Sequence, residues 1–366
     1  MNISKEIEIK HKKVKRLLES CNLDGLLLAK QSNFKWFTCG GKNDVVRSSD
    51  VSLVYLFITI DKRYLIATSS DAYRIMDEEL KNLDFEMILY NWYNQSFDNV
   101  IKKLGKKSIG ADFYSNHLKY MDTEIRAVRA ELTQSEIERF KKLYQDYNSI
   151  LTEYCFNIKP GKTEIEAAAE IEYRCRSNNI NLPVLMVGSD ERVFSYRHPC
   201  TTGKKINNYM LIATVAEREG LCANISRSIY FGKIPNELKL KQDTVNYIEA
   251  NYQYFSKPGN TLGTIFENGK KAYAETGYPD EWKNHLQGGI SGYSPLEFMA
   301  LENSKIIVRE NNIISWNPTV KGAKSEDPHL ITKNGVLQLP IDSRWPVKEY
   351  GVNKDRIFIR PLILEL

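Results

Sequence analysis

In the first 130 residues, the hydrophobic pattern alternates between a helical period and short apolar runs of strand length. Stretches of helical spacing are residues 3–20, 71–81 and 95–104. Strand-like runs are residues 26–29, 51–60, 63–69, 85–90 and 107–112. Helices that alternate with strands in this way predict a mixed α/β domain that ends near residue 130.

From residue 131 onward, long amphipathic helices alternate with strands. Helices are predicted over residues 134–158, 164–178, 236–256 and 262–276, and strands over residues 183–187, 209–216 and 225–231. Thr163 and Glu166 form a capping box for the helix at 164–178.

One junction in this part of the chain occurs twice. The sequences KPGKT (159–163) and KPGNT (257–261) lie 98 residues apart, and each one separates a long helix from a second helix. This repeat predicts an internal duplication, with two α/β halves facing each other across a pseudo-twofold axis and a ligand cleft between them. The predicted fold class is α+β, with domains at 1–130 and 131–366.

Composition narrows the classes of function. The 366 residues carry 51 Lys and Arg against 46 Asp and Glu, and the two signs are interspersed, so no nucleic-acid partner is expected. No run approaches the roughly 18 apolar residues of a membrane span, and the charged N-terminus lacks an apolar signal core, so a cytoplasmic protein without a membrane partner is expected. The six cysteines show no CxxC spacing, which argues against structural zinc.

The segment HLQGGISGY (285–293) is the most unusual local sequence. Gly288 and Gly289 allow backbone to approach a ligand closely, His285 is expected to titrate near neutral pH, and Tyr293 is suited to a pocket wall. The alternative is a glycine-rich turn with a structural histidine.

Other polar residues lie on or beside the predicted cleft strands. His198 is a candidate general acid or base, or a loop histidine bonded to backbone. Arg227, in an apolar strand, requires an anionic partner, which is either a structural carboxylate or a bound anion. Glu326 is a candidate to hold a substrate cation or share a proton with His198, or an exposed turn acid. Asn317 is a pocket residue or a turn former before Pro318.

Residue types on these strands argue against a two-metal site, which needs several converging carboxylates. Residues 209–216 and the segment ISWNP (314–318) carry no acid, and Asn224 stands where an acid would help. Glu326 and Asp327 are the acids that remain. No metal and no other cofactor are therefore expected.

Six motifs, taken in order, resemble the creatinase/aminopeptidase P family (M24, "pita-bread" fold). They are ELTQSEIERFKK (131–142), IKPGKTEIEAAAEI (158–171), VGSDERVFSYRHP (187–199), ISRSIYFG (225–232), HLQGGISGY (285–293) and KSEDPHLIT (324–332). The resemblance implies a creatinase-like N-terminal domain over residues 1–130 and a pita-bread domain after it.

The resemblance also implies that this chain has lost its metals. Metal-dependent members bind their ions with two aspartates, a histidine and two glutamates. The matching positions here are Ala213, Asn224, Gly289 and Asn317, and only the last glutamate is retained, as Glu326. Creatinase, a metal-free member, has its catalytic histidine at the position of His198.

These observations predict a metal-independent hydrolase of a C–N bond in a small polar substrate or short peptide, with His198 as general acid/base and Glu326 as its catalytic partner. The alternatives are a catalytically silent binding protein and a metal-dependent Xaa-Pro peptidase. The resemblance implies a homodimer in which Arg47 contacts the site of the other subunit. The predicted substrate-binding residues are Arg227, His285, Gly288, Gly289, Tyr293, Asn317, Asn224 and Arg47.

Overall fold

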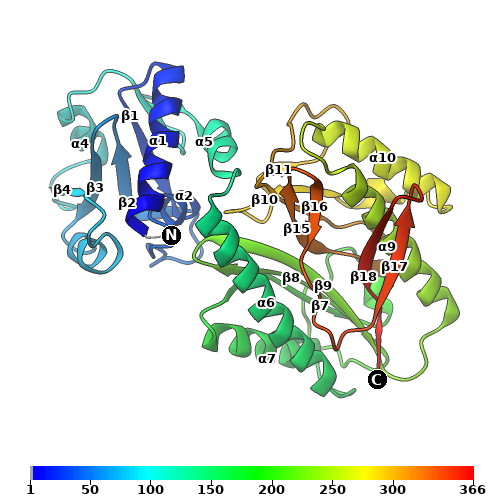
Figure 1. Cartoon of the computed structure of the whole chain (residues 1–366). Coiled ribbons are helices and arrows are strands. Elements are labelled where there is room, and N and C mark those ends of the chain that lie inside the picture. The colour runs from blue at the N-terminus through cyan, green and yellow to red at the C-terminus, as the bar shows by residue number, and fades with distance from the viewer. Residues whose placement is uncertain (1–2) are drawn as a thin grey trace. The chain divides into compact units, whose positions relative to one another are not determined.

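The computed structural model describes residues 3–366, and the chain divides into two compact units, Met1–Glu136 and Ile137–Leu366. Each unit contains its own sheets and helices (Figure 1), which confirms the predicted two-domain α+β class. The division falls within the first turn of α6 (Gln134–Asn157). Across residues 3–366, no helix combines the length and apolar character needed to cross a membrane.

The N-terminal unit is built on a six-stranded sheet with the order β4-β3-β2-β1-β5-β6. The β1–β2 and β2–β3 pairs are antiparallel, and the remaining pairs are parallel. The strands are β1 (Gly25–Lys30), β2 (Val51–Ile58), β3 (Arg63–Thr68), β4 (Glu86–Tyr90), β5 (Ile109–Ala111) and β6 (Lys119–Tyr120). The helices are α1 (Ile3–Cys21), α2 (Gln31–Phe37), α3 (Ala72–Arg74), the π-helix η1 (Ile75–Glu79), α4 (Phe97–Lys103) and α5 (Asp122–Arg129).

Two features of this unit depart from the predicted elements. The helix expected over 71–81 is divided into α3 and η1, and α2 and α5 were not predicted. In the seven-residue α2, Phe34, Trp36 and Phe37 are all buried. A short helix buried on several sides has no polar face, so it leaves no amphipathic period in the sequence.

The C-terminal unit carries four longer helices, all close to their predicted bounds. They are α6, α7 (Glu164–Ser177), α9 (Asn236–Phe255) and α10 (Leu262–Glu275), and Figure 1 shows α9 and α10 next to each other. The predicted capping box is confirmed: the Glu166 amide donates to the Thr163 side chain, and the Thr163 amide donates to the Glu166 carboxylate at 2.8 Å. The short helices are α8 (Glu191–Ser195) and the 3₁₀-helix η2 (Glu281–Asn284).

Two main sheets meet in this unit. One has four strands in the order β19-β9-β8-β7, and the other has five in the order β11-β10-β12-β15-β16. A hydrogen bond joins the two sheets: the Ser226 amide of β9 donates to the carbonyl of Glu326, the residue before β15, at 3.0 Å. The strands are β7 (Asn181–Ser189), β8 (Tyr209–Arg218), β9 (Leu221–Tyr230), β10 (Gly288–Ser291), β11 (Phe298–Met299), β12 (Ile313–Trp316), β13 (Thr319–Val320), β14 (Ala323–Lys324), β15 (Asp327–Thr332), β16 (Gly335–Gln338), β17 (Val347–Val352), β18 (Arg356–Pro361) and β19 (Leu364–Glu365).

The two repeated junctions adopt the same backbone geometry. Gly161 and Gly259 both have φ of +92°, a left-handed conformation that glycine adopts without steric cost. The Gly161 amide donates to the Ile206 carbonyl at 2.8 Å, and the Gly259 amide donates to the Val308 carbonyl at 3.0 Å. Each junction ends in a threonine that caps the next helix. This local equivalence supports the predicted duplication.

Candidate functional site

Side-chain alternation along β9 separates two environments. Asn224 and Ser226 point to one face of the strand and Arg227 points to the other, because successive residues in a strand face opposite sides. The same alternation separates Glu326 from Asp327 at the start of β15. One face carries a buried ionic network, and the other carries the candidate site.

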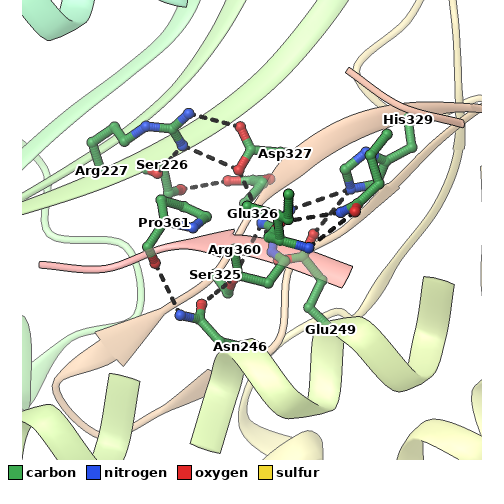
Figure 2. A network of polar contacts seen from close by, with 12 residues as sticks. Ser226, Arg227, Asn246, Glu249, Ser325, Glu326, Asp327, His329, Arg360 and Pro361 are labelled. Atoms are coloured by element: carbon green, nitrogen blue, oxygen red, sulfur yellow. Dashed lines mark hydrogen bonds and ion pairs between the residues drawn. The ribbon is translucent and has the colours of Figure 1, made fainter. Parts of the chain in front are cut away.

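The ionic network lies on the Arg227 side of β9 (Figure 2), where Asn148 of α6 and Glu249 of α9 accept hydrogen bonds from its two arginines. Arg227 donates to the two carboxylate oxygens of Asp327 at 2.9 and 3.2 Å, and Arg360 donates to Asp327 at 2.9 Å. Arg360 also bonds to Glu249 at 2.5 Å, and His329 lies 3.5 Å from Glu249. All five side chains are buried.

Arg227 therefore has a structural carboxylate as its anionic partner, the first of the two alternatives. Its guanidinium also donates to the Ser226 carbonyl and to Asn148, and it lies over the ring of Trp345. Asp327 and the neighbouring Tyr144 keep the pKa of Arg227 above its ordinary value although burial acts against the charge. The arginine predicted to bind substrate instead holds the strands together.

The opposite face holds a compact acid–base cluster. The Ser226 hydroxyl donates to the Glu326 carboxylate at 2.6 Å, and the Lys324 ammonium lies 3.3 Å from the same oxygen. All three residues are at least 94% buried. Glu326 is thus a buried, paired carboxylate rather than an exposed turn acid. The mutual attraction of Glu326 and Lys324 offsets the free-energy cost of removing both charged groups from water.

Two asparagines border this cluster with unsatisfied oxygens. β12 and β15 pair Trp316 with Asp327, so Asn317 and Glu326 follow as the next cross-strand neighbours. Asn224 shares its side of β9 with Ser226. Both asparagines are only 8% exposed, and within the described chain the Oδ1 atoms of both are buried without a hydrogen-bond partner.

His198 and His285 form a direct contact, with their Nε2 atoms 3.1 Å apart. An ion pair between Arg197 and Glu281 joins the two segments that carry them. Burial, Lys324 and His198 lower the pKa of His285 to about 3. Partial burial and Lys324 also lower the pKa of His198, against an opposing effect of Glu326. Both imidazoles are therefore neutral at pH 7 and share one proton along the Nε2–Nε2 axis.

The partner of His198 differs from the predicted one. We expected Glu326 to orient His198 or share its proton, whereas the imidazole bonds to His285 and the carboxylate bonds to Ser226 and Lys324. Glu326 acts on His198 only through its electrostatic field. The two predicted catalytic residues are thus linked by charge and not by a hydrogen bond.

Gly288 and Gly289 serve chain packing. Their φ values are +101° and +149°, and a Cβ atom would lie 2.1 Å from the Ser315 carbonyl oxygen at Gly288 and 2.1 Å from the Phe298 carbonyl oxygen at Gly289. The expectation that these glycines leave room for substrate is corrected: the space belongs to the neighbouring strands. Tyr293 is 2% exposed, and its amide donates to Glu297 at 3.0 Å.

Lys324 is the site residue that sequence reasoning missed. It stands two positions before Glu326 in KSEDP, where the run of charges reads as a solvated turn. The i, i+2 spacing of an alternating strand pattern was the available signal that Lys324 and Glu326 share a side.

Arg47 lies in an exposed loop of the N-terminal unit, and its contact with another subunit stays a prediction.

The residues present do not fit a pair of divalent ions. Ala213 and Gly289 have no side-chain donor, and the neutral amides of Asn224 and Asn317 are weak substitutes for carboxylates. The carboxylate of Glu326 already neutralises the Lys324 ammonium, which would repel a cation placed beside it. Among residues 3–366, no group of three or more His, Cys, Asp or Glu side chains is arranged to hold a metal.

The sequence matches two family models. The model of metallopeptidase family M24 matches residues 138–333, and the model of the creatinase/prolidase N-terminal domain matches residues 10–143. The chain belongs to metallopeptidase family M24. This membership confirms the resemblance drawn from the six motifs.

Similar proteins match nearly the whole chain. A Xaa-Pro dipeptidase of Pyrococcus horikoshii is 25% identical over 360 residues, which span 91% of this chain and 98% of the relative. The structure of a prolidase from Thermococcus sibiricus covers 100% of both chains, with a TM-score of 0.77 and 17% identity. The N-terminal domain of FACT complex subunit SPT16 from Cicer arietinum covers 93% of this chain and 96% of its own, with a TM-score of 0.70 and 13% identity.

Proposed function

We propose that this M24 protein hydrolyses a C–N bond in a small polar molecule without metal ions, and that His198 is its general acid and base. The observation that supports the proposal is the contact between His198 and His285, two neutral imidazoles beside the buried Lys324–Glu326 pair. A neutral imidazole that is held by a partner can accept a proton from water at its free nitrogen.

The proposed reaction balances on the residues of this chain. His198 Nδ1 takes a proton from water while the resulting hydroxide adds to the carbon of the scissile C–N bond. That bond then breaks, and the imidazolium returns the proton to the departing nitrogen. His285 holds the His198 ring through Nε2, and its low pKa keeps it neutral throughout.

Substitution of His198 tests this proposal. His198→Ala should lower turnover of an amide substrate by about 10²–10⁴-fold, the usual contribution of a general acid–base residue. The assay measures release of ammonia or amine from a panel of small amides by chelator-treated protein. His117→Gln, which changes an exposed histidine of the N-terminal unit, is the matched control. Equal turnover by wild type and His198→Ala would refute the assignment.

A catalytically silent binding protein is the second candidate. It is favoured by the loss of side-chain donors at Ala213 and Gly289, which removes the metal chemistry of the family and leaves a site able to bind a ligand. Binding of small amides without His198-dependent release of amine would establish it.

The metal-dependent Xaa-Pro peptidase, the third alternative, requires stoichiometric bound metal and cleavage of Xaa-Pro dipeptides that a chelator abolishes.

A further inference from the structure

The unsatisfied atoms of the candidate site indicate the kind of ligand it binds. Asn224 Nδ2 donates to the Pro295 carbonyl at 3.1 Å, which fixes the amide orientation and leaves Oδ1 as the free acceptor. Asn317 Oδ1 is likewise buried and has no partner among the described residues. A buried oxygen without a hydrogen bond is costly, so both positions require N–H or O–H donors.

The charges of the site indicate that the ligand is neutral. Lys324 and Glu326 cancel each other, and the two histidines carry no charge at pH 7. An anion would have to displace Glu326 from Lys324, and a cation would meet the ammonium without a free carboxylate. An uncharged ligand enters without leaving a buried charge unpaired.

We propose that the site binds an uncharged carbamoyl group that carries at least two N–H groups, as in a primary amide or a urea derivative. Its N–H groups donate to Asn224 Oδ1 and Asn317 Oδ1, and its carbonyl oxygen accepts from the Lys324 ammonium. This inference rests on the proposed function, because it names the substrate class of the same site.

Lys324 gains a catalytic role in this arrangement. When hydroxide adds to the carbamoyl carbon, negative charge moves to the carbonyl oxygen, and an ammonium beside it stabilises that charge. Glu326 positions the ammonium through their ion pair at 3.3 Å. The Lys324 ammonium, fixed in this way, stabilises the negative charge on the carbonyl oxygen with a group of the protein chain.

The proposed ligand differs from a Xaa-Pro substrate in one chemical respect. The nitrogen of a Xaa-Pro bond is a tertiary amide and has no hydrogen. It cannot donate to Asn224 or Asn317, so the scissile nitrogen itself satisfies neither oxygen. A pocket built around two acceptors therefore favours amides with N–H over prolyl amides.

Four small probes test the proposal on the intact protein. They are acetamide, its N,N-dimethyl derivative, acetate and acetamidinium, which separate N–H donation from charge. Binding is followed by titration of the imidazole resonances of His198 and His285, with the exposed His117 as internal reference. We expect acetamide to bind about tenfold more tightly than each of the others, the effect of one buried hydrogen bond.

Three substitutions localise the effect. Asn224→Leu and Asn317→Leu should each weaken acetamide binding by about tenfold and leave the dimethyl derivative unchanged. Lys324→Met should weaken both neutral amides and raise the relative affinity for acetamidinium. Wild-type selectivity among the four probes tests the proposal even if a variant fails to fold.

The outcomes separate this inference from the proposed function. Equal or tighter binding of acetate, acetamidinium or dimethylacetamide overturns the inference, and so does an absence of any response to acetamide. Selective amide binding without His198-dependent turnover refutes the hydrolase and leaves the carbamoyl site in place. His198-dependent turnover of a substrate that lacks N–H leaves the hydrolase in place and refutes the carbamoyl site.

Discussion

Ser226 and Arg227 are adjacent in the chain, yet their side chains serve different purposes. Ser226 donates to Glu326 in the candidate site, and Arg227 is bonded to Asp327 in the buried network (Figure 2). Side chains alternate in the same way along β9 and along Glu326–Asp327, and this match fixes the register between the two segments. A slip of one residue would bring Arg227 into the site and bury an unpaired charge.

The low pKa of His285 predicts a specific dependence of stability on pH. Its ordinary pKa is 6.5, and in the folded protein it falls to about 3. Below pH 6.5 the unfolded chain takes up a proton that the folded chain does not, so the unfolding free energy falls as pH decreases. The slope from this group is about 1.4 kcal/mol per pH unit.

Replacement of His285 should remove this contribution. Urea titrations between pH 7.5 and pH 5 should show a smaller loss of unfolding free energy for His285→Gln than for wild type. His117→Gln should retain the wild-type dependence. A His285→Gln curve parallel to that of wild type would contradict the assigned neutral, buried state.

The sequence predicts several polar residues of the candidate site, but it does not predict which residue each of them bonds to. His198, His285, Asn317 and Glu326 were selected because polar groups on apolar cleft strands require a reason. Sequence spacing did not indicate that His198 pairs with His285 over 87 residues of chain, because this contact depends on how two loops meet. Arg227 was selected for the same reason as the others, and its partner Asp327 was visible only in the fold.

At the scale of elements, the four longer helices of the C-terminal unit were predictable to within one or two residues. Each has an amphipathic period, and a Pro-Gly pair follows α6 and α9. For these two helices the hydrophobic period and the helix-stop signal therefore indicate the same end. Helix α2 has no such agreement of signals, because its aromatic residues are buried on several sides. Strand β9 begins at Leu221, four residues before the predicted start, because Ala223 and Asn224 are poor strand formers and interrupt the strand pattern there.

The repeated junction predicts the cost of replacing its glycine. A Cβ at Gly259 has no atom within 4 Å, so the only penalty is the left-handed φ of +92°. Gly259→Ala should lower the unfolding free energy by about 1–2 kcal/mol. Gly203 also has open space around it but no left-handed φ, and Gly203→Ala should change the value by no more than about 0.5 kcal/mol. Equal effects in urea unfolding would contradict a strain at the junction.

At the scale of the whole molecule, the fold is shared with proteins of very different sequence. The chain superposes on the Thermococcus sibiricus prolidase with a TM-score of 0.77 at 17% identity. The positions matched to the metal ligands of family M24 nevertheless carry Ala213, Asn224, Gly289 and Asn317. A fold of this kind is held by its cores and its buried ionic network, so site residues can change while the architecture persists.

Divalent ions should therefore leave the stability of this protein unchanged. A ligand present at a hundred times its dissociation constant raises the unfolding free energy by about 2.7 kcal/mol when it binds only the folded chain. Thermal unfolding of chelator-treated protein should show the same midpoint before and after addition of Mn²⁺ or Zn²⁺. A rise in the midpoint together with two bound ions per chain would overturn the account of the site.

Gly289 stands where the family resemblance places a ligand histidine, and the local backbone leaves no room for such a side chain. Any side chain at this position would collide with the Phe298 carbonyl oxygen, which lies 2.1 Å from where its Cβ would stand. Gly289→His would therefore disturb the pairing of β10 and β11 before its imidazole could bind anything. A single substitution at this position cannot supply a new ligand unless the two strands rearrange.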